Sequence, residues 1–466
     1  MFHDALVPFA ERRLIFMEKV RDMTSGNAAK HIVRFALPLV LANLGQQLYM
    51  IVDTIIVGRG VGVEALAAVG ATDWTYWLIL WIIQALTQGF ATCVAQYFGE
   101  KNSNGLKKAV TMSCVLCLIT GIILTIAGLV MAAPLLKLLK TPDNIYGDAK
   151  AYLCVLVSGT LIVMAFNMAS SILRALGNGK APLIAIAIAG VSNVVLDIAF
   201  VILFKWGVMG AAFATVTAQF IAFMYCAFTL KGIRIISVTK EDWKKDNYII
   251  KKLLKMGVPL AIQYSLISIG GMILQSTINK QGFIFVAGFT ATNKVYGLLE
   301  SSAIALGFAM TTYTAQNYGA GLIKRIFSGV KSAVMIAVVM SACVSTVMIV
   351  WGRNVLGMFI SAGEEGAAEA LDIAYHLLFI MSVMLVFLYL LHVFRCILQG
   401  LGDSIAPLLS GIIEFCVRVF IATILTSVCG SSVIFFAEPV AWIGSELVLM
   451  ISCFVQFRKL KQIKIS

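Results

Sequence analysis

Two aspartates within otherwise apolar stretches are the residues of this chain best suited to do chemistry. Asp53 lies in LPLVLANLGQQLYMIVDTIIVGRGVG at residues 37–62, and Asp197 lies in SNVVLDIAF at residues 192–200. A carboxylate at the centre of a membrane helix costs about 2.5–3.5 kcal/mol on insertion scales, so it usually faces an interior cavity and has a function there. Asp53 is therefore the first functional candidate.

Helical spacing places further polar residues beside the two aspartates. Asn43, Gln46 and Asp53 fall on one side of a helix and form a polar stripe on an otherwise lipid-compatible surface. Asn193 and Asp197 are four residues apart and therefore share a face of another helix. We expect the stripe to face protein or water.

The composition indicates that these helices lie in a membrane. Of the 466 residues, 60% are hydrophobic and 13% are charged, and the mean hydropathy is +0.93. Soluble domains are about 45–50% apolar and about 25% charged. The sequence predicts an all-α polytopic membrane protein with twelve spans, because twelve apolar segments reach about 18 residues. The predicted spans are residues 32–57, 67–98, 109–133, 151–173, 182–204, 207–230, 257–279, 284–312, 329–351, 371–394, 405–428 and 438–457.

Basic residues predict the orientation of the spans. Lys and Arg near span ends are retained on the cytoplasmic side, and most of the 36 fall on one side if the N-terminus is cytoplasmic; Arg174 and Arg395 are counted there as loop residues. We predict a multi-pass protein of the plasma (cytoplasmic) membrane with both termini in the cytoplasm. The net charge of +13 is dispersed over short loops, so it does not indicate nucleic-acid binding.

The cysteines and histidines predict neither disulfides nor a metal centre. Nine of the ten cysteines lie in apolar segments or within two residues of one, and Cys429 lies in a predicted outward-facing loop. The pair Cys114-x-x-Cys117 falls inside a hydrophobic helix with no second pair and no nearby histidine. The four histidines share no ligand spacing, and His376 and His392 are expected to be packed or interfacial groups. No cofactor is expected.

An internal repeat divides the chain into two halves. ILRALGNGKAP at residues 172–182 recurs as ILQGLGDSIAP at residues 397–407. Six spans per half give both halves the same orientation, related by an axis along the membrane normal, and such halves typically enclose a substrate path. The predicted parts are a cytoplasmic N-terminal extension at 1–22 unless translation begins at Met23, an N-lobe at 23–230, a basic cytoplasmic linker at 231–255, a C-lobe at 256–457 and a cytoplasmic tail at 458–466.

The motifs of the two halves resemble the multidrug and toxic compound extrusion (MATE) transporters, in their bacterial branch. The resemblance covers about residues 23–457, and its carriers are QQLYMIVDTIIVGRGVGVEALAAVG, AQYFGEKN, ILRALGNGKAP, SNVVLDIAF, GAAFATVTAQ, AQNYGAG, ILQGLGDSIAP and AEPVAWIG. It implies two six-helix bundles that alternate between inward and outward openings. It also implies export of amphipathic, often cationic, drug-like molecules in exchange for protons or sodium.

The resemblance also implies a cation site in the N-lobe. The family's site matches Gln46, Asp53, Asn193, Asp197 and Thr215, with Asn167 as a looser match. Two carboxylates close together in a low-dielectric cavity would hold a proton, and their oxygens with those of Asn193 and Thr215 would equally suit sodium. No other metal is expected. The alternative is that each aspartate only bonds neighbouring helices.

The C-lobe gives weaker signals. Some family members place a Glu early in the seventh span and an Asp in the middle of the tenth. Here Gln263 and Tyr264 occupy the first region and Asp372 lies only at the start of the tenth span, so a carboxylate site of that kind is not expected. Glu300 has no partner at helical spacing and either faces a cleft or bonds another helix. A substrate path is predicted to include Glu300, Tyr296, Gln263, Tyr264 and Trp74, with interfacial anchoring as the alternative for the aromatic residues.

Glu414 precedes Arg418 by four residues, the favourable order for an ion pair on a helix, so we predict a structural ion pair. The function predicted from all these features is secondary active efflux by a monomer. The alternatives are a lipid-linked sugar flippase of related fold and a membrane-embedded enzyme; the chain carries no nucleotide-binding loop or nucleophile constellation to support the latter.

Overall fold

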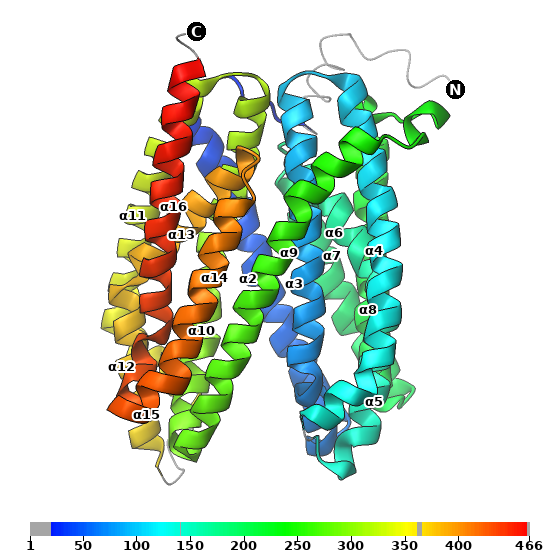
Figure 1. Cartoon of the computed structure of the whole chain (residues 1–466). Helices are drawn as coiled ribbons and strands as arrows, with labels where there is room; N and C mark the ends of the chain where they lie inside the picture. The colour runs from blue at the N-terminus through cyan, green and yellow to red at the C-terminus, as the bar shows by residue number, and fades with distance from the viewer. Residues whose placement is uncertain (1–19, 140, 361–365, 464–466) are drawn as a thin grey trace. The chain divides into compact units, whose positions relative to one another are not determined.

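The computed structural model describes residues 20–139, 141–360 and 366–463, and the described residues are predominantly helical (Figure 1). Ten helical segments are long and apolar enough to cross a membrane, and two pairs of bent helices bring the number to twelve. The twelve predicted spans are confirmed, and most of the helices are longer than predicted. Most of the predicted N-terminal extension and the end of the tail lie outside the described residues.

The spans of the first sequence half are α2 (Ala28–Gly60), α3 (Val63–Gly99), α4 (Ser103–Leu138), the pair α5 (Asp143–Ser158) and α6 (Thr160–Ala175), α7 (Lys180–Asp197) and α8 (Gly207–Lys231). Those of the second half are α9 (Asn247–Ile278), α10 (Phe283–Gly319), α11 (Ile323–Gly357), the pair α12 (Ala367–Val383) and α13 (Leu385–Gly400), α14 (Ile405–Phe420), and α16 (Ala437–Ile463).

Contacts divide the chain into two compact units. The first comprises residues 1–27, 37–257 and 315–322, and the second comprises residues 28–36, 258–314 and 323–466. The first unit therefore takes in the end of α10 from the second sequence half, and the second takes in the start of α2 from the first half. The helices α2, α9 and α10 each contribute residues to both units.

Matching irregularities in the two halves support the internal repeat. The pairs α5–α6 and α12–α13 bend by 45° and 50°, and in each pair the repeated motif begins near the end of the second helix. A Cβ at Gly159, the first bend, would lie 2.4 Å from Cγ2 of Val216 on α8, so this close approach requires glycine. After each motif, α7 and α14 continue into π-helical turns at Ile198–Leu203 and Ile421–Leu425. Such turns are rare and occur frequently at functional sites.

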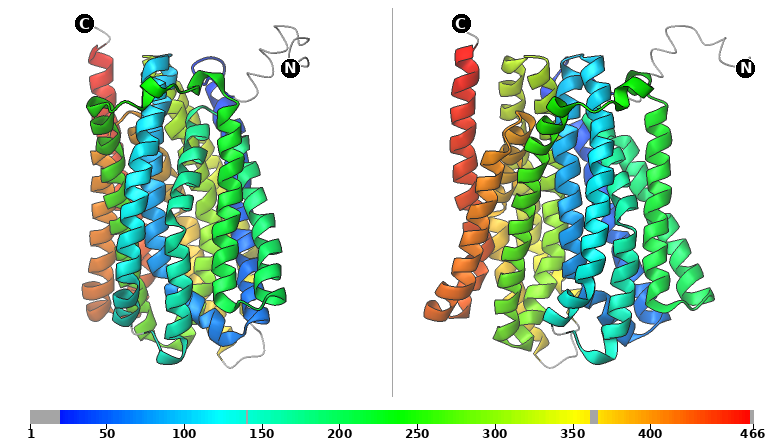
Figure 2. Two further views of the ribbon diagram at one scale, coloured as in Figure 1. Left: turned by 90° about the vertical axis from the view of Figure 1, so that its right-hand side faces the viewer. Right: turned by 45° about the vertical axis from the view of Figure 1, so that its right-hand side comes forward.

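Small residues form the core of the first unit. The helix α8 packs against α5, α6 and α7, and α4, α6 and α8 run nearly parallel (Figures 1 and 2). The face of α8 that is buried consists mainly of alanine, including Ala211, Ala214, Ala218 and Ala222. Small side chains allow membrane helices to approach closely. The uncovered faces of α4 and α11 are apolar, as suits contact with lipid.

The linker after α8 is anchored to α4. Two short 3-10 helices, Arg234–Ile236 and Lys240–Trp243, lead to α9. Asp246 lies 3.2 Å from Nζ of Lys108, and its carboxylate accepts a hydrogen bond from the backbone N–H of Ile249. The N–H of Ile249 and the ammonium group of Lys108 hold the pKa of Asp246 below its ordinary value. The start of α9 is therefore held against α4.

Four buried or partly buried charges join three helices of the second unit. Glu414 of α14 forms ion pairs with Arg395 of α13 and, at 3.5 Å, with Arg418 one turn along its own helix. Arg418 lies 2.7 Å from Glu438 of α16. We call Arg395, Glu414, Arg418 and Glu438 the charge network. Its two positive and two negative groups balance.

The network corrects two predictions from the sequence. Arg395 is not a loop residue, because α13 continues to Gly400 and buries the guanidinium group. Arg174 likewise lies in the last turn of α6, where it donates hydrogen bonds to Ser170 and Ser171. Glu414 and Arg418 do form an ion pair, but each has a closer partner on another helix. Spacing within one helix could not indicate those partners.

The network predicts an order of destabilisation. Glu414→Gln leaves Arg395 buried without its carboxylate, and breaking a buried pair in this way costs about 3–5 kcal/mol. Glu438→Gln is expected to cost less, because Arg418 keeps Glu414 and Glu438 lies near a helix end. The check is the melting temperature of the purified variants in detergent. Equal melting temperatures for wild type and Glu414→Gln would show that the network does not stabilise the unit.

Candidate functional site

The structure brings the two aspartates of the first unit together. Asp53 of α2 and Asp197 of α7 lie close enough for their carboxyl groups to interact directly. Asp197 is fully buried at the last position of α7, immediately before the π-helical turn. One turn earlier on α7, Asn193 donates a hydrogen bond of 3.4 Å to the hydroxyl of Thr215 on α8. Four of the predicted site residues therefore lie on three adjoining helices.

Several oxygens of this cluster have no hydrogen-bond partner among the described residues. They are Oδ1 of Asp53, both carboxylate oxygens of Asp197, and Oδ1 of Asn193. Buried polar atoms in proteins are nearly always paired, so a group of unpaired oxygens calls for an explanation. A proton or a hard monovalent cation would satisfy such a set, because both interact best with oxygen.

Two predicted members of the site form no hydrogen bond with the aspartates among the described residues. Asn167 of α6 donates to the carbonyl of Val163 in its own helix, at 2.9 Å. Gln46 is half-buried on α2, two turns before Asp53. Both remain predicted members of the site.

Tyrosines near the aspartates were not predicted as part of this site. Tyr49 of α2 and Tyr152 of α5 both interact electrostatically with Asp53, and Tyr76 of α3 lies beside both tyrosines. The spacing of Tyr49 and Asp53, four residues apart on one helix, is a signal that could have found the first. The position of Tyr152 depends on the packing of α5, which the sequence does not specify.

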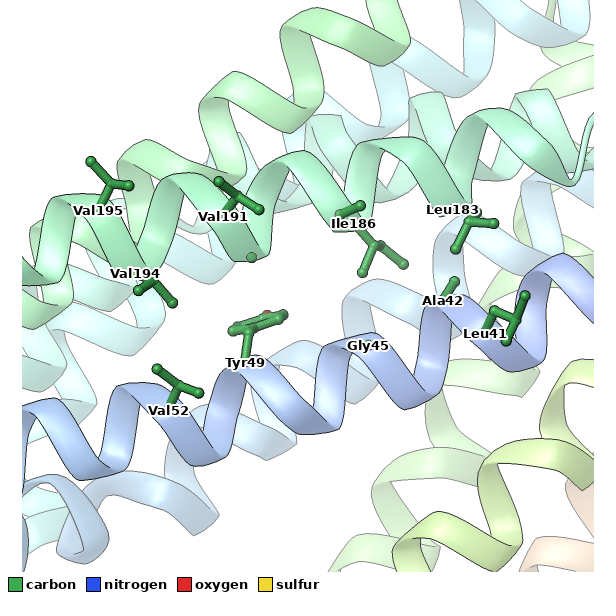
Figure 3. Close-up of a pocket in the computed structure, with 12 residues that line it drawn as sticks. Leu41, Ala42, Gly45, Tyr49, Val52, Leu183, Ile186, Val191, Val194 and Val195 are labelled. Atoms are coloured by element: carbon green, nitrogen blue, oxygen red, sulfur yellow. The ribbon is translucent and has the colours of Figure 1, made fainter.

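An apolar groove of about 450 Å³ lies between α2 and α7. Figure 3 shows Tyr49 on α2 pointing toward α7, with Val191, Val194 and Val195 on the facing helix. Gly190 keeps the groove open beside the tyrosine, since a Cβ there would lie 3.3 Å from the ring. The groove ends within one turn of both Asp53 and Asp197. Its volume falls in the range of about 300–1,000 Å³ found for small-molecule sites.

The residues of the predicted substrate path lie in different places. Tyr296 of α10 stacks on Trp442 of α16, with ring centroids 5.8 Å apart. Gln263 of α9 is fully buried, and its side-chain oxygen and nitrogen have no partner among the described residues. Tyr264 and Glu300 are near each other in the same unit. Trp74 lies on α3 of the first unit and is exposed.

At one end of the first unit, segments from both sequence halves pack with backbone against backbone. The motifs AQYFG at 95–99 and AQNYG at 315–319 meet at their glycines. A Cβ at Gly99 would lie 1.9 Å from the carbonyl oxygen of Gln316, and a Cβ at Gly319 would lie 2.0 Å from that of Gln96. We call this the glycine contact. The two segments can approach this closely only because neither position carries a side chain.

The segment before α2 covers the glycine contact. The backbone N–H of Met23 donates to Oε1 of Gln316 at 2.9 Å, and Nδ2 of Asn317 donates to the carbonyl oxygen of Met23 at 3.2 Å. The N–H of Arg21 donates to the carbonyl oxygen of Leu176, in the repeated motif, at 3.0 Å. Nε2 of Gln316 donates to that of Ala175 at 2.9 Å. This end of the unit is therefore closed by four hydrogen bonds, one between two backbone groups and three between a backbone group and a side chain.

Comparison with known proteins identifies the family. The MatE family model matches residues 38–199 and 259–443. The chain is 32% identical over 311 residues to the probable multidrug resistance protein YpnP of Bacillus subtilis, covering 66% of this chain and 69% of that protein. It is 22% identical over 389 residues to the probable multidrug resistance protein NorM of Thermotoga maritima, covering 82% of each. The chain belongs to the MatE family; it is a drug efflux transporter and not an enzyme.

Solved structures share the fold. A crystal structure of MATE in complex with MaL6 matches with a TM-score of 0.87 at 23% identity, covering 95% of this chain and 99% of that chain. A MOP superfamily transporter from Pyrococcus furiosus matches with a TM-score of 0.87 at 23% identity, covering 94% and 98%. The protein therefore has the architecture of twelve transmembrane helices in two bundles.

The glycine contact generates a prediction for Gly99→Ala. The added methyl group cannot fit beside the carbonyl of Gln316, and overpacking of this kind costs about 1–3 kcal/mol. The closed end should therefore open more often, so the rate at which a maleimide labels a Met23→Cys reporter should rise about tenfold. Met23 suits a reporter because it is fully buried and because its hydrogen bonds to Gln316 and Asn317 are made by its backbone.

The matched control is Gly70→Ala on the same helix, where a Cβ would have no neighbour within 4 Å. Labelling in this control should equal that of the parent. An unchanged rate in Gly99→Ala would mean that the glycine contact does not hold this end closed.

Proposed function

We propose that this protein exports amphipathic, cationic small molecules across the plasma membrane in exchange for protons or sodium ions. The observation that carries the proposal is the Asp53–Asp197 pair with its unpaired buried oxygens. Two carboxylates in a site of low polarity repel each other when both are ionised. One bound cation relieves this repulsion, so the pair can serve as the binding site of the driving ion.

Exchange requires that ion binding and conformation depend on each other. A ligand shifts a conformational equilibrium only by the difference between its affinities for the two states. Asp53 lies on α2 and Asp197 at the end of α7, next to the π-helical turn. A small movement of either helix would separate the carboxylates and change the affinity for the ion. Such a movement would couple the ion to alternating access.

The groove between α2 and α7 supports an amphipathic cargo. Its walls are aliphatic apart from Tyr49, and its end lies close to a pair of carboxylates. An apolar body would bind the walls, and a positive group would be attracted by the carboxylates and by the ring of Tyr49. Cargo and driving ion would then compete for the same negative charge, which is the requirement for exchange.

We further propose that both termini are cytoplasmic and that the monomer is the working unit. Cys429 ends the short helix α15 (Thr426–Cys429) and is exposed, and Lys245 is exposed in the linker. A thiol reagent that cannot cross the membrane should label Cys429 of intact cells from outside. In a Cys429→Ser background it should label Lys245→Cys only after the membrane is opened. The reverse accessibility would invert the proposed topology.

The carboxylate pair is tested by Asp53→Asn and Asp197→Asn. Asparagine keeps the shape and a hydrogen bond but removes the titratable charge, so each variant should fold while gradient-driven export of ethidium from liposomes falls at least about tenfold. Imposing a proton gradient and a sodium gradient separately identifies the driving ion. The control is Asp143→Asn, an exposed carboxylate in the first turn of α5. Wild-type dependence on the gradient in Asp53→Asn would remove the pair from the coupling mechanism.

A further inference from the structure

A second titratable pair lies in the other unit, between α10 and α13. Nε2 of His392 is 3.7 Å from Oε1 of Glu300, and both side chains are largely covered, with exposed fractions of 10% and 25%. The separation is longer than a hydrogen bond. It is short enough for a strong ion pair once the imidazole is protonated.

Backbone contacts on both sides of the pair fix its geometry. The hydroxyl of Tyr389, one turn before His392, donates to the carbonyl oxygen of Leu299 at 3.3 Å. One turn after His392, α13 approaches α10 so closely that a Cβ at Gly307 would lie 2.9 Å from Sγ of Cys396. The helices α10 and α13 are therefore in contact on both sides of Glu300 and His392.

The charges around the pair leave the negative charge of Glu300 without an opposite charge, although Tyr296 interacts with it through a side-chain hydrogen bond. Arg395 and Arg418 are matched by Glu414 and Glu438 in the charge network. With His392 neutral, Glu300 adds one uncompensated charge to this group. An unpaired ion held away from water is unfavourable. One proton on the imidazole makes the whole group neutral.

The remaining groups that face the pair do not carry an opposite charge to replace that proton. The titratable and charged side chains around Glu300 and His392 are Tyr264 of α9, Tyr296 of α10, Tyr389, Arg395 and Cys396 of α13, Glu414 and Arg418 of α14, and Glu438 of α16. The arginines are already engaged by the glutamates. Gln263, whose buried amide has no hydrogen-bond partner in the part of the chain that the structure describes, packs against Gly411 of α14 and adds polarity without charge.

We propose that Glu300 and His392 form a second proton-binding site of the transporter, separate from the Asp53–Asp197 pair. Uptake of a proton converts a loose contact of 3.7 Å into a charge-assisted pair that joins α10 to α13. Loss of the proton leaves Glu300 free to attract a positively charged cargo. The inference rests on the proposed function, since it assigns a further site for the ion exchanged with cargo.

The helix α10 gives this site a route to the glycine contact. Glu300 and Gly319 belong to the same continuous helix, separated along it by about 28 Å at 1.5 Å per residue. A movement at one end of a rigid helix can displace its other end, provided that each end can pack in two alternative arrangements. The proton would thereby bias the closed end through the movement of one helix.

The experiment measures protons released when ethidium binds to purified wild-type protein, with a pH-sensitive dye in weakly buffered detergent solution at neutral pH. Glu300→Gln should still bind ethidium but release about one proton fewer per protein than wild type. His392→Asn should show the same deficit by removing the other partner. The control is Glu369→Gln, an exposed carboxylate in the first turn of α12, which should match wild type.

The outcomes separate the two proposals. If wild type moves ethidium in gradient-free exchange across liposomes and Glu300→Gln releases as many protons as wild type, the second site is wrong while efflux stands. If wild type moves no ethidium, the proposed function fails. If Glu300→Gln does not fold, the number of protons that His392→Asn releases on binding ethidium is the test. A number equal to that of wild type would overturn the inference.

Discussion

The cost of holding an ionised group inside a membrane governs this structure. Every charge within the spans needs a partner of opposite sign, a route to water, or a proton, because several kcal/mol separate a paired charge from an unpaired one. The middle parts of α4 and α11, at residues 118–131 and 335–351, satisfy this constraint because they contain no charged residue. The interiors of the two bundles meet this constraint in different ways. One arrangement of charges stabilises the fold, and the other serves the transport function.

The charge network of the second unit is balanced, whereas the aspartate pair of the first unit is not. Arg395, Glu414, Arg418 and Glu438 neutralise one another and hold three helices together. Asp53 and Asp197 have no such cation among the described residues, and their oxygens are unpaired. A site whose negative charge is neutralised by a mobile ion can change its conformation when that ion leaves. A site completed by arginine cannot, so the first arrangement suits coupling and the second suits support.

Much of the architecture could be predicted from the sequence because hydropathy and repetition are properties of the chain itself. Twelve spans follow from the apolar segments, and the duplicated motifs indicate a repeat that the bends at Gly159 and before α13 support. Partners on different helices could not be predicted. Arg395 was assigned to a loop and His392 to packing, since their carboxylates, Glu414 and Glu300, lie on other helices. The helical spacing of Asn193 and Asp197 was informative because both lie on one helix.

The most direct test of the account is the affinity of the purified wild-type protein for ethidium, measured by fluorescence across pH 5–8 and with or without sodium. If ion and cargo share one negative charge, each must weaken the binding of the other by the same factor, typically about 5–150-fold. The account predicts weaker ethidium binding as the concentration of the driving ion rises. An affinity that is independent of both pH and sodium would contradict it.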